Sequence, residues 1–344
     1  MWNPRTYHDE DFGLEEGDSF EPETRDDEIP AVPTTEPHIM TLLGPIVPEE
    51  LGICLPHVHL LCDPPGADLD HRLTDADSAE SEVEAFVTMN GRGLVECSTK
   101  DAGRMVAPLL QIAGWVPAHL ISVTGRHNHR YASAMPNALD KDSLTEEFVA
   151  ELTVGLDGTE ARAGVIKVGT SLNDITDVER VALHAAAAAH VRTGAPITTH
   201  TENGTMALEL IETLTLNGVP ANRIVIGHVD RVPMALNSHL KIARTGAFLQ
   251  FDQIGKSEEY TDQIRAERVV ELVRAGFGDQ ILLSLDYARR SQLVSYDGKP
   301  GLSYLSEWFM VLLLEAGLEA MDVRKLVIDN PARALTIHPP KTAI

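Results

Sequence analysis

A regular alternation of short apolar segments with longer amphipathic ones constrains the fold of this chain more than any other feature. Each short segment has the length and the β-branched content of a buried strand, and the longer stretches repeat apolar residues at helical spacing. We expect strands at 52–60, 93–97, 119–124, 164–168, 196–200, 223–227, 247–251 and 281–285. An open doubly wound sheet would share this pattern, but the count of eight and the polar residues at many strand ends favour an α/β fold of the (β/α)8 TIM barrel type.

Helices are expected between these strands, at 78–89, 100–112, 144–155, 177–192, 205–217, 234–244, 261–275 and 304–316. Thr176 and Glu179 have the spacing of a capping box in front of an alanine-rich helix. Gly194 and Gly317 stand just past helical stretches, where C-terminal caps are common. The residues from Met321 onward are expected to form a closing helical segment.

The first 37 residues differ from the rest because they are acidic, rich in proline and poor in residues that could form a core. Such a composition is typical of a solvated arm. We therefore expect a disordered or surface-draped acidic arm at 1–37, followed by one barrel domain at 38–344.

The net charge and the cysteines limit the binding partners and the cellular compartment that we expect for the protein. The 344-residue chain has a formal net charge of −24, which disfavours binding to nucleic acid or to an anionic membrane surface. Cys54, Cys62 and Cys97 form no disulfide framework, and the start of the chain does not look like a secretory signal. We therefore expect a soluble, cytoplasmic protein.

Polar residues recur at the C-terminal ends of the expected strands, where side chains of a barrel converge on one mouth. His57 and His59 alternate along the first strand, so both can face one ion. The full set of candidate metal ligands is His57, His59, Lys167, His200, His228 and Asp286. Zinc thiolate ligation by Cys54 and Cys62 is an alternative, although the chain has no Cys-x-x-Cys pair.

Lys167 lies inside an apolar strand, where an unpaired ammonium would be costly. It could be a strand-end lysine that reaches solvent, but the imidazoles at other strand ends favour a buried amine. A deprotonated amine that captures carbon dioxide becomes a carbamate, which can bridge two cations. We expect two divalent ions, zinc first and manganese or cobalt as alternatives, bridged by N6-carboxylated Lys167.

The expected chemistry follows from this ligand set. His57, His59 and Asp286 would hold the more buried ion, and His200 and His228 the more exposed one. A hydroxide that bridges the two ions would be the nucleophile, because paired cations lower the pKa of water. Asp286 would take the proton and pass it to the leaving oxygen.

These motifs resemble the phosphotriesterase-like family of the amidohydrolase superfamily over residues 41–334. The resemblance is carried by His57-Val58-His59, the Lys167 strand, the segments around His200 and His228, Leu285-Asp286 and Asn330-Pro331-Ala332-Arg333. Its binuclear site agrees with the ligand roles given above.

Within that family the chain is most similar to the sugar-lactone and phosphosugar-lactone hydrolases, through the runs at 201–205, 251–256 and 288–291. This resemblance implies that Lys256 and Arg289 clamp a distal phosphate; as an alternative, both are ordinary loop cations. Glu202, Arg231 and His127 are further candidates for substrate binding.

Three positions depart from the family pattern. Val58 replaces a non-ligand glutamate, Leu285 replaces a glycine before the aspartate, and Gln292 stands where a phosphate-contacting tyrosine is expected. The last change weakens the expectation of a phosphorylated substrate more than the expectation of a lactone.

The leading hypothesis is a metal-dependent hydrolase that opens a small-molecule lactone, as a monomer or as a homodimer like its relatives. Hydrolysis of phosphotriesters or N-acyl-homoserine lactones is the alternative within the same chemistry. A catalytically inactive barrel that only binds a small ligand is the alternative from another class, and the complete ligand set argues against it.

Overall fold

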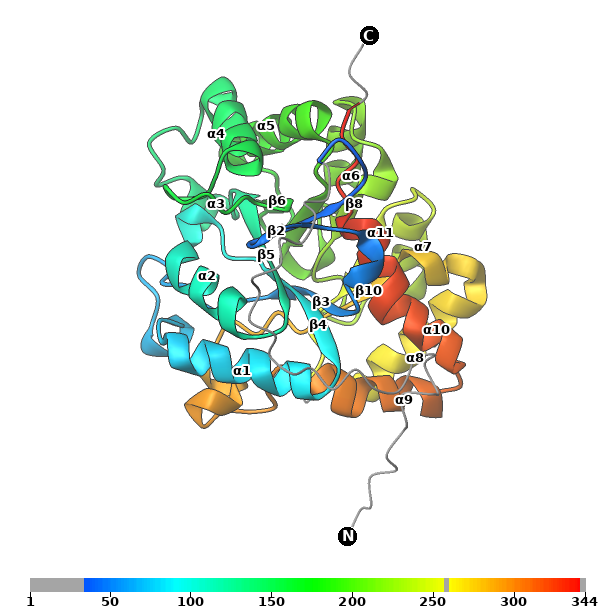
Figure 1. The fold of residues 1–344 in the computed structure, drawn as a ribbon. Helices are drawn as coiled ribbons and strands as arrows, with labels where there is room; N and C mark the ends of the chain where they lie inside the picture. Colours follow the sequence, from blue (N-terminus) through cyan, green and yellow to red (C-terminus); the bar gives the residue numbers. More distant parts are fainter. Residues whose placement is uncertain (1–33, 257–259, 341–344) are drawn as a thin grey trace.

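The computed structural model describes residues 34–256 and 260–340, and its centre is a sheet of eight parallel strands. Neighbouring strands pair in chain order from β3 to β10, and helices surround them (Figure 1). The strands are β3 (Ile53–Val58), β4 (Gly91–Glu96), β5 (His119–Gly125), β6 (Val165–Thr170), β7 (Ile197–Thr201), β8 (Ile224–Ile226), β9 (Phe248–Phe251) and β10 (Ile281–Leu283). All eight overlap the segments that the sequence predicts.

The sheet is nearly closed by contacts between its first and last strands. The hydroxyl of Ser284 accepts the His57 N–H at 2.9 Å and donates to the His57 carbonyl at 2.7 Å. The backbone N–H of Asp286 donates to the same carbonyl at 2.9 Å. These bonds join the end of β10 to β3, so the predicted barrel is confirmed.

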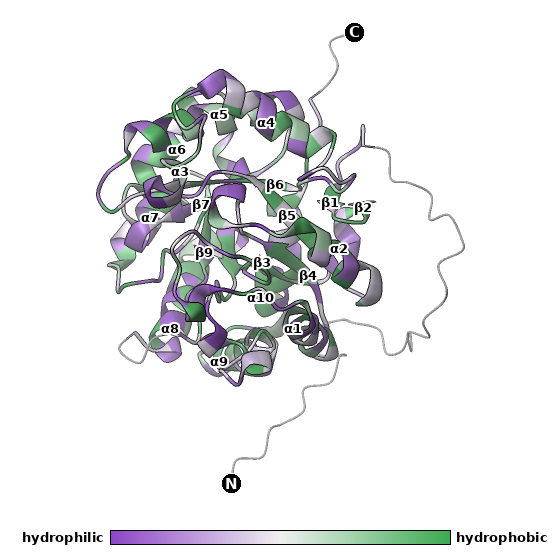
Figure 2. Ribbon diagram, turned by 90° about the vertical axis from the view of Figure 1, so that its left-hand side faces the viewer, coloured by the Kyte–Doolittle hydropathy of each residue, from purple (hydrophilic) through white to green (hydrophobic). Residues whose placement is uncertain are grey.

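The helices lie on the outside of the sheet with their apolar sides inward, and Figure 2 shows green strands inside a ring of mixed green and purple helices. The helices are α1 (Ala76–Thr88), α2 (Val106–Trp115), α3 (His129–Ala132), α4 (Lys141–Thr153), α5 (Asp177–Thr193), α6 (Ala207–Leu216), α7 (Leu236–Ala243), α8 (Asp262–Leu272), α9 (Met310–Glu315), α10 (Ala320–Arg324) and α11 (Asn330–Leu335).

Two local features differ from expectation. The helix expected at 100–112 is split, because Gly103 takes a left-handed conformation (φ 79°) after a single turn at Lys100–Ala102. The short helix α3 was not predicted, and it lies in the loop after β5.

The capping box in front of α5 is confirmed, and it does more than start a helix. Thr176 and Glu179 cap each other reciprocally, and Gly194 ends the helix with φ 75°. The buried Glu179 carboxylate also accepts the backbone N–H of His129 at 2.8 Å and the Ser171 hydroxyl at 2.6 Å. One carboxylate therefore ties the start of α5 to α3.

The opposite, N-terminal end of the barrel is apolar. The hairpin of β1 (Ile39–Thr41) and β2 (Gly44–Ile46) lies beside the start of β5, with the Leu42 N–H bonded to the Leu120 carbonyl. Ile39, Cys54, Val95, Ile121 and Val165 form one buried cluster there. Polar interior groups are therefore concentrated at the other end.

The expected acidic arm falls mostly outside the described residues, which begin at position 34. The exposed segment 34–37 leads into His38, which pairs with Ile337. Within the described part of the chain, no helix has the length and apolarity needed to cross a membrane.

A buried histidine away from the strand-end cluster gives a test of the packing. His239 on α7 is fully buried, stacks on Phe251 at 5.4 Å, and its Nε2 bonds to the Val229 carbonyl at 2.9 Å. Burial lowers the pKa of His239 from 6.5 to about 4. The folded state therefore holds this imidazole neutral in a pH range where the unfolded chain protonates it.

Because the folded pKa is depressed, the stability from neutral His239 is present above pH 6.5 and is lost as the pH falls toward 4. Between pH 7 and pH 5 this group should cost about 2 kcal/mol. We predict that His239→Gln is less sensitive than the wild type to acid over this range by about that amount. Urea unfolding at the two pH values measures it, and parallel curves for both proteins would contradict the prediction.

Candidate metal centre

All six candidate ligands lie at the C-terminal end of the barrel, at or near the ends of five strands. His57 and His59 come from β3 and the residues after it, Lys167 from β6, and His200 from β7; His228 and Asp286 follow β8 and β10. His228 and Asp286 have φ values of 61° and 45°, which non-glycine residues rarely adopt. Strained conformations of this kind are typical of functional sites.

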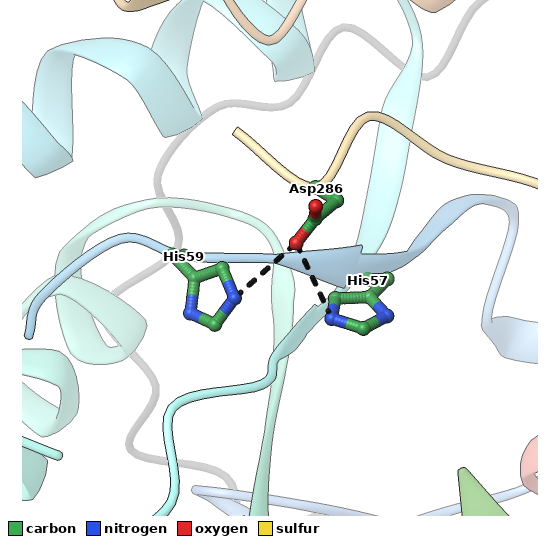
Figure 3. A group of neighbouring side chains, drawn as sticks. All are labelled: His57, His59 and Asp286. Atoms are coloured by element: carbon green, nitrogen blue, oxygen red, sulfur yellow. Dashed lines mark ion pairs between the residues drawn. The ribbon is translucent and has the colours of Figure 1, made fainter. Parts of the chain in front are cut away.

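The first ligand group joins His57, His59 and Asp286 (Figure 3). One carboxylate oxygen, Oδ1 of Asp286, lies 3.5 Å from His57 Nε2 and 3.4 Å from His59 Nε2. One ligand atom from each of the three residues lies within 4.8 Å of the other two. Two imidazoles and a carboxylate in this arrangement suit a divalent transition metal.

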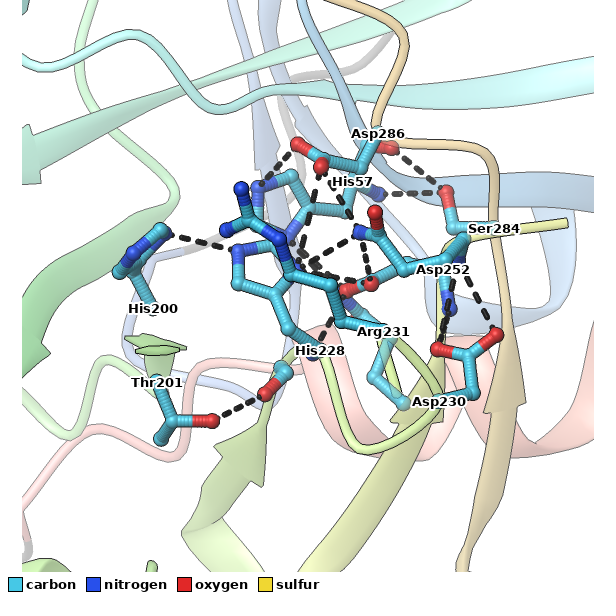
Figure 4. Close-up of polar contacts among 12 residues, drawn as sticks. His57, His200, Thr201, His228, Asp230, Arg231, Asp252, Ser284 and Asp286 are labelled. Carbon is cyan, nitrogen blue, oxygen red and sulfur yellow. Dashed lines mark hydrogen bonds and ion pairs between the residues drawn. The ribbon is translucent and has the colours of Figure 1, made fainter. Parts of the chain in front are cut away.

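The second group joins His200 and His228, whose rings meet edge-on at 4.5 Å and are joined by a dashed line in Figure 4. His228 Nε2 lies 2.8 Å from His200 Nδ1, and the His57 and His228 rings are 5.0 Å apart. Both groups therefore belong to one cluster, as a two-metal site requires.

Lys167 lies beside the first group. It is fully buried, and its Nζ is 2.9 Å from His57 Nε2. Within residues 34–256 and 260–340, no carboxylate forms an ion pair with this amine. Lys167 is therefore buried as expected, and the alternative of a strand-end lysine that reaches solvent is wrong. An isolated ammonium at this depth is costly, so the site suits a neutral amine or its carboxylated form.

Asp252, at the end of β9, fixes the orientation of two rings. Its Oδ1 lies 2.8 Å from His228 Nδ1, and its Oδ2 lies 3.5 Å from His57 Nδ1, which also has Gln250 Nε2 at 2.9 Å. Although burial opposes ionisation, the charge and hydrogen bond of His228 hold the pKa of Asp252 below its usual value. A carboxylate at Nδ1 leaves the Nε2 lone pair of each ring for a metal.

The other two histidines have comparable partners. His59 Nδ1 bonds to the Ser98 hydroxyl at 2.8 Å, and His200 Nε2 bonds to Glu202 Oε1 at 2.9 Å. The hydrogen bond from His200 lowers the pKa of Glu202 to about 2, and burial lowers the pKa of His200 to about 4. Each of the four rings therefore uses one nitrogen for support and presents the other to the cluster.

Asp230 lies one step further from the histidines than Asp252. Its carboxylate accepts the backbone N–H groups of Asp252 and Gln253, and it pairs with Arg265 Nε at 3.0 Å (Figure 4). Burial, and then the charge of Asp252, raise the pKa of Asp230 to about 7. Asp230 and Arg265 thus hold the segment that carries Asp252.

Asp286 is held on its second oxygen. Oδ2 accepts hydrogen bonds from Lys256 Nζ at 2.7 Å and Gln253 Nε2 at 2.9 Å. Burial alone would raise the pKa of Asp286, but the Lys256 ammonium and then His228 keep it well below its usual value. The carboxylate is therefore ionised, and its Oδ1 faces the imidazoles.

A cavity of about 190 Å³ opens beside the cluster. Its lining includes three candidate ligands and three of the predicted substrate residues: His59, His200, Asp286, His127, Glu202 and Arg231. Sequence reasoning missed Asn128, Arg130 and Tyr131, which also line it. The polar residues that follow β5 in the sequence could have indicated that this loop lines the cavity.

Both cations of the predicted phosphate clamp have a carboxylate partner. Lys256 Nζ lies 2.7 Å from Oδ2 of Asp286, which lines the cavity, and Arg289 Nη1 lies 3.3 Å from Asp70. Their role as a clamp stays a prediction. The Gln292 amide oxygen accepts the Ala288 N–H at 3.0 Å. Anion binding by either cation would require the exchange of an existing ion pair.

Cysteine plays no part in the ligand groups found among the described residues. Cys54 lies in the apolar cluster at the opposite end of the barrel, and burial raises the pKa of its thiol. Cys62 lines the cavity, but it belongs to neither ligand group, and burial raises the pKa of its thiol to about 12. The alternative of zinc thiolate ligation is therefore not supported.

Comparison with known proteins places this architecture in a family. The model of the phosphotriesterase family matches residues 37–335. The phosphotriesterase homology protein of Escherichia coli is 33% identical over 83% of this chain and 98% of its own length. A phospho-furanose lactonase of Mycoplasmopsis synoviae is 31% identical, covering 86% of this chain and 90% of its own.

Two further relatives extend this comparison. An N-acetyltaurine hydrolase of Dictyostelium discoideum is 30% identical over 77% of this chain and 75% of its own. The crystal structure of a lactonase from Listeria monocytogenes superposes with a TM-score of 0.81 at 34% identity, covering 87% of this chain and 99% of its own. The chain belongs to the phosphotriesterase family, and these relatives identify it as a hydrolase.

Proposed function

We propose that this protein is a binuclear metal-dependent hydrolase that opens a lactone, specifically a sugar or phosphosugar lactone. The observation that carries the proposal is the convergence of six ligand-type side chains from five strands, with His59, His200 and Asp286 on the wall of one cavity. The phospho-furanose lactonases and the Listeria lactonase among its relatives support the choice of substrate.

In this proposal His57, His59 and Asp286 would hold one divalent cation and His200 and His228 a second, and Lys167, once carboxylated, would supply a further anionic ligand. Zinc suits these ligands best, with manganese or cobalt as alternatives. Divalent cations there supply Lewis-acid chemistry, since they acidify water and polarise a carbonyl oxygen.

The residues of the chain do the remaining work. Asp286 accepts the proton of the attacking water and returns it to the leaving alkoxide. Lys256 and Gln253 keep its second oxygen in place during this transfer. Asn128 and His127 face the cavity and orient the substrate beside His200.

The polar residues of the cavity support the choice of a sugar lactone. Arg130, Asn128, Glu202 and Arg231 are among the residues that line it. A sugar lactone offers hydroxyl groups for these polar side chains.

Metal analysis and carbon-13 NMR test the ligand set. We expect about two divalent ions per purified wild-type chain. After ¹³C-bicarbonate labelling we expect one carbamate resonance, which Lys167→Ala lacks and exposed Lys325→Ala retains. A wild-type chain that takes up no metal after supplementation would instead support a binding role without catalysis.

Asp252 provides a test of how the rings are oriented. Removing a carboxylate that supports a metal-binding histidine lowers metal affinity by about 10–100-fold. We predict a loss of this size for Asp252→Ala in competition with a fluorescent zinc chelator. Exposed Asp174→Ala is the matched control, and equal affinities in both variants would mean that Asp252 does not position the ligands.

Lys256→Gln separates two roles for this lysine. Because its ammonium holds Asp286, we predict that kcat falls about equally for a phosphorylated sugar lactone and for its unphosphorylated counterpart, by roughly tenfold. Steady-state kinetics on the pair measures this. A rise in KM confined to the phosphorylated lactone would establish Lys256 as a phosphate clamp instead.

A further inference from the structure

Glu96, the last residue of β4, is a fully buried carboxylate that the proposed chemistry does not use. We propose that Glu96 is a positioning residue of the candidate metal centre: through Ser98 it keeps the proton of the His59 ring on Nδ1, so that Nε2 stays available to a cation. The inference deepens the proposed function and rests on it, because it concerns how one candidate ligand is prepared for its metal.

The register of the sheet places Glu96 beside the two candidate ligands of the first strand. Glu96 pairs with Val58, the residue between His57 and His59. Its side chain has no exposed surface. A buried carboxylate is costly unless hydrogen-bond donors surround it, so the donors around Glu96 indicate what this residue holds in place.

Three backbone N–H groups donate to the Glu96 carboxylate. Those of Leu60 and Leu61, which directly follow His59, donate to Oε2, the second of them at 3.3 Å. That of Ser98 donates to Oε1 at 2.8 Å. One side chain therefore fastens the backbone after His59 to the backbone after β4, where Ser98 lies.

Ser98 connects this carboxylate to the His59 ring. Its hydroxyl lies 2.8 Å from His59 Nδ1, and Glu96 Oε1 lies 3.8 Å from the same nitrogen. On the other side of the ring, Asp286 Oδ1 lies 3.4 Å from Nε2. A neutral imidazole carries one proton, and each of these two carboxylates attracts that proton to its own side of the ring.

The position of this proton decides whether His59 can bind a cation. A proton on Nε2 would point toward Asp286 and would occupy the lone pair that a metal needs. A serine hydroxyl can donate or accept, so Ser98 alone does not select the tautomer. The negative charge behind Ser98 favours a proton on Nδ1. Glu96 therefore opposes Asp286 across the ring and keeps Nε2 in the form that binds a metal.

Glu96→Gln tests this assignment, because it keeps the size of the side chain and removes its charge. The matched control is Glu179→Gln. Glu179 is equally buried and also accepts backbone N–H groups from two segments, at His129 and at Thr176. Both substitutions replace an acceptor oxygen by an amide donor, so a loss of stability alone does not distinguish the two variants.

Nitrogen-15 NMR of the metal-free proteins shows which nitrogen of His59 carries the proton. We expect Glu96→Gln to shift the tautomers of His59 toward Nε2–H, and Glu179→Gln to leave them as in the wild type. In competition with a fluorescent zinc chelator, we expect Glu96→Gln to weaken one of two bound ions by about tenfold or more and to leave the second unchanged. Tautomers like those of the wild type, or zinc affinities equal to those of Glu179→Gln, would overturn the assignment.

Ser98→Ala, which removes only the hydroxyl at Nδ1, keeps the test decisive if Glu96→Gln does not fold. The same shift toward Nε2–H supports the assignment, and an unchanged ring spectrum contradicts it. These spectra require neither a metal nor turnover. If the wild type hydrolyses no lactone but the ring spectra change as expected, the proposed function fails and the role of Glu96 stands.

Discussion

The arrangement of the ligand cluster depends on a fully buried lysine amine, Lys167, in contact with the imidazole of His57. Lys167 Nζ lies 2.9 Å from His57 Nε2, and no carboxylate among the described residues forms an ion pair with it. Burial lowers the pKa of His57 far below its usual value. A neutral imidazole with a free lone pair is what a metal ligand requires.

Buried acidic residues behind the histidines hold the ligand cluster in place. Asp252 faces two of the rings, Asp230 holds the backbone of Asp252, and Arg265 neutralises Asp230. These three charged side chains are fully buried, and such groups persist only where each has its own partner. A continuous series of contacts thus runs from Arg265 through Asp230 and Asp252 to His228, and it keeps the Asp252 carboxylate next to the histidine.

Much of the fold and the ligand set follows from the sequence, because strand ends and ligands are local properties. Eight apolar segments are visible one at a time, and His57, His59, His200, His228 and Asp286 stand at their ends. Partners across the barrel are not local. Asp252 meets His57 across 195 positions of the chain, and Lys256 meets Asp286 only because the two loops fold together.

The seam of the barrel carries a consequence for its integrity. β10 and β3 are joined by Ser284 and by the Asp286 amide, both bonded to His57, so two ligand-type residues lie on opposite sides of the joint between the first and last strands. Anything that bridges the side chains of His57 and Asp286 also fastens this joint. Separation of β10 from β3 would then also separate His57 from Asp286, so opening of the barrel and loss of the site would occur together.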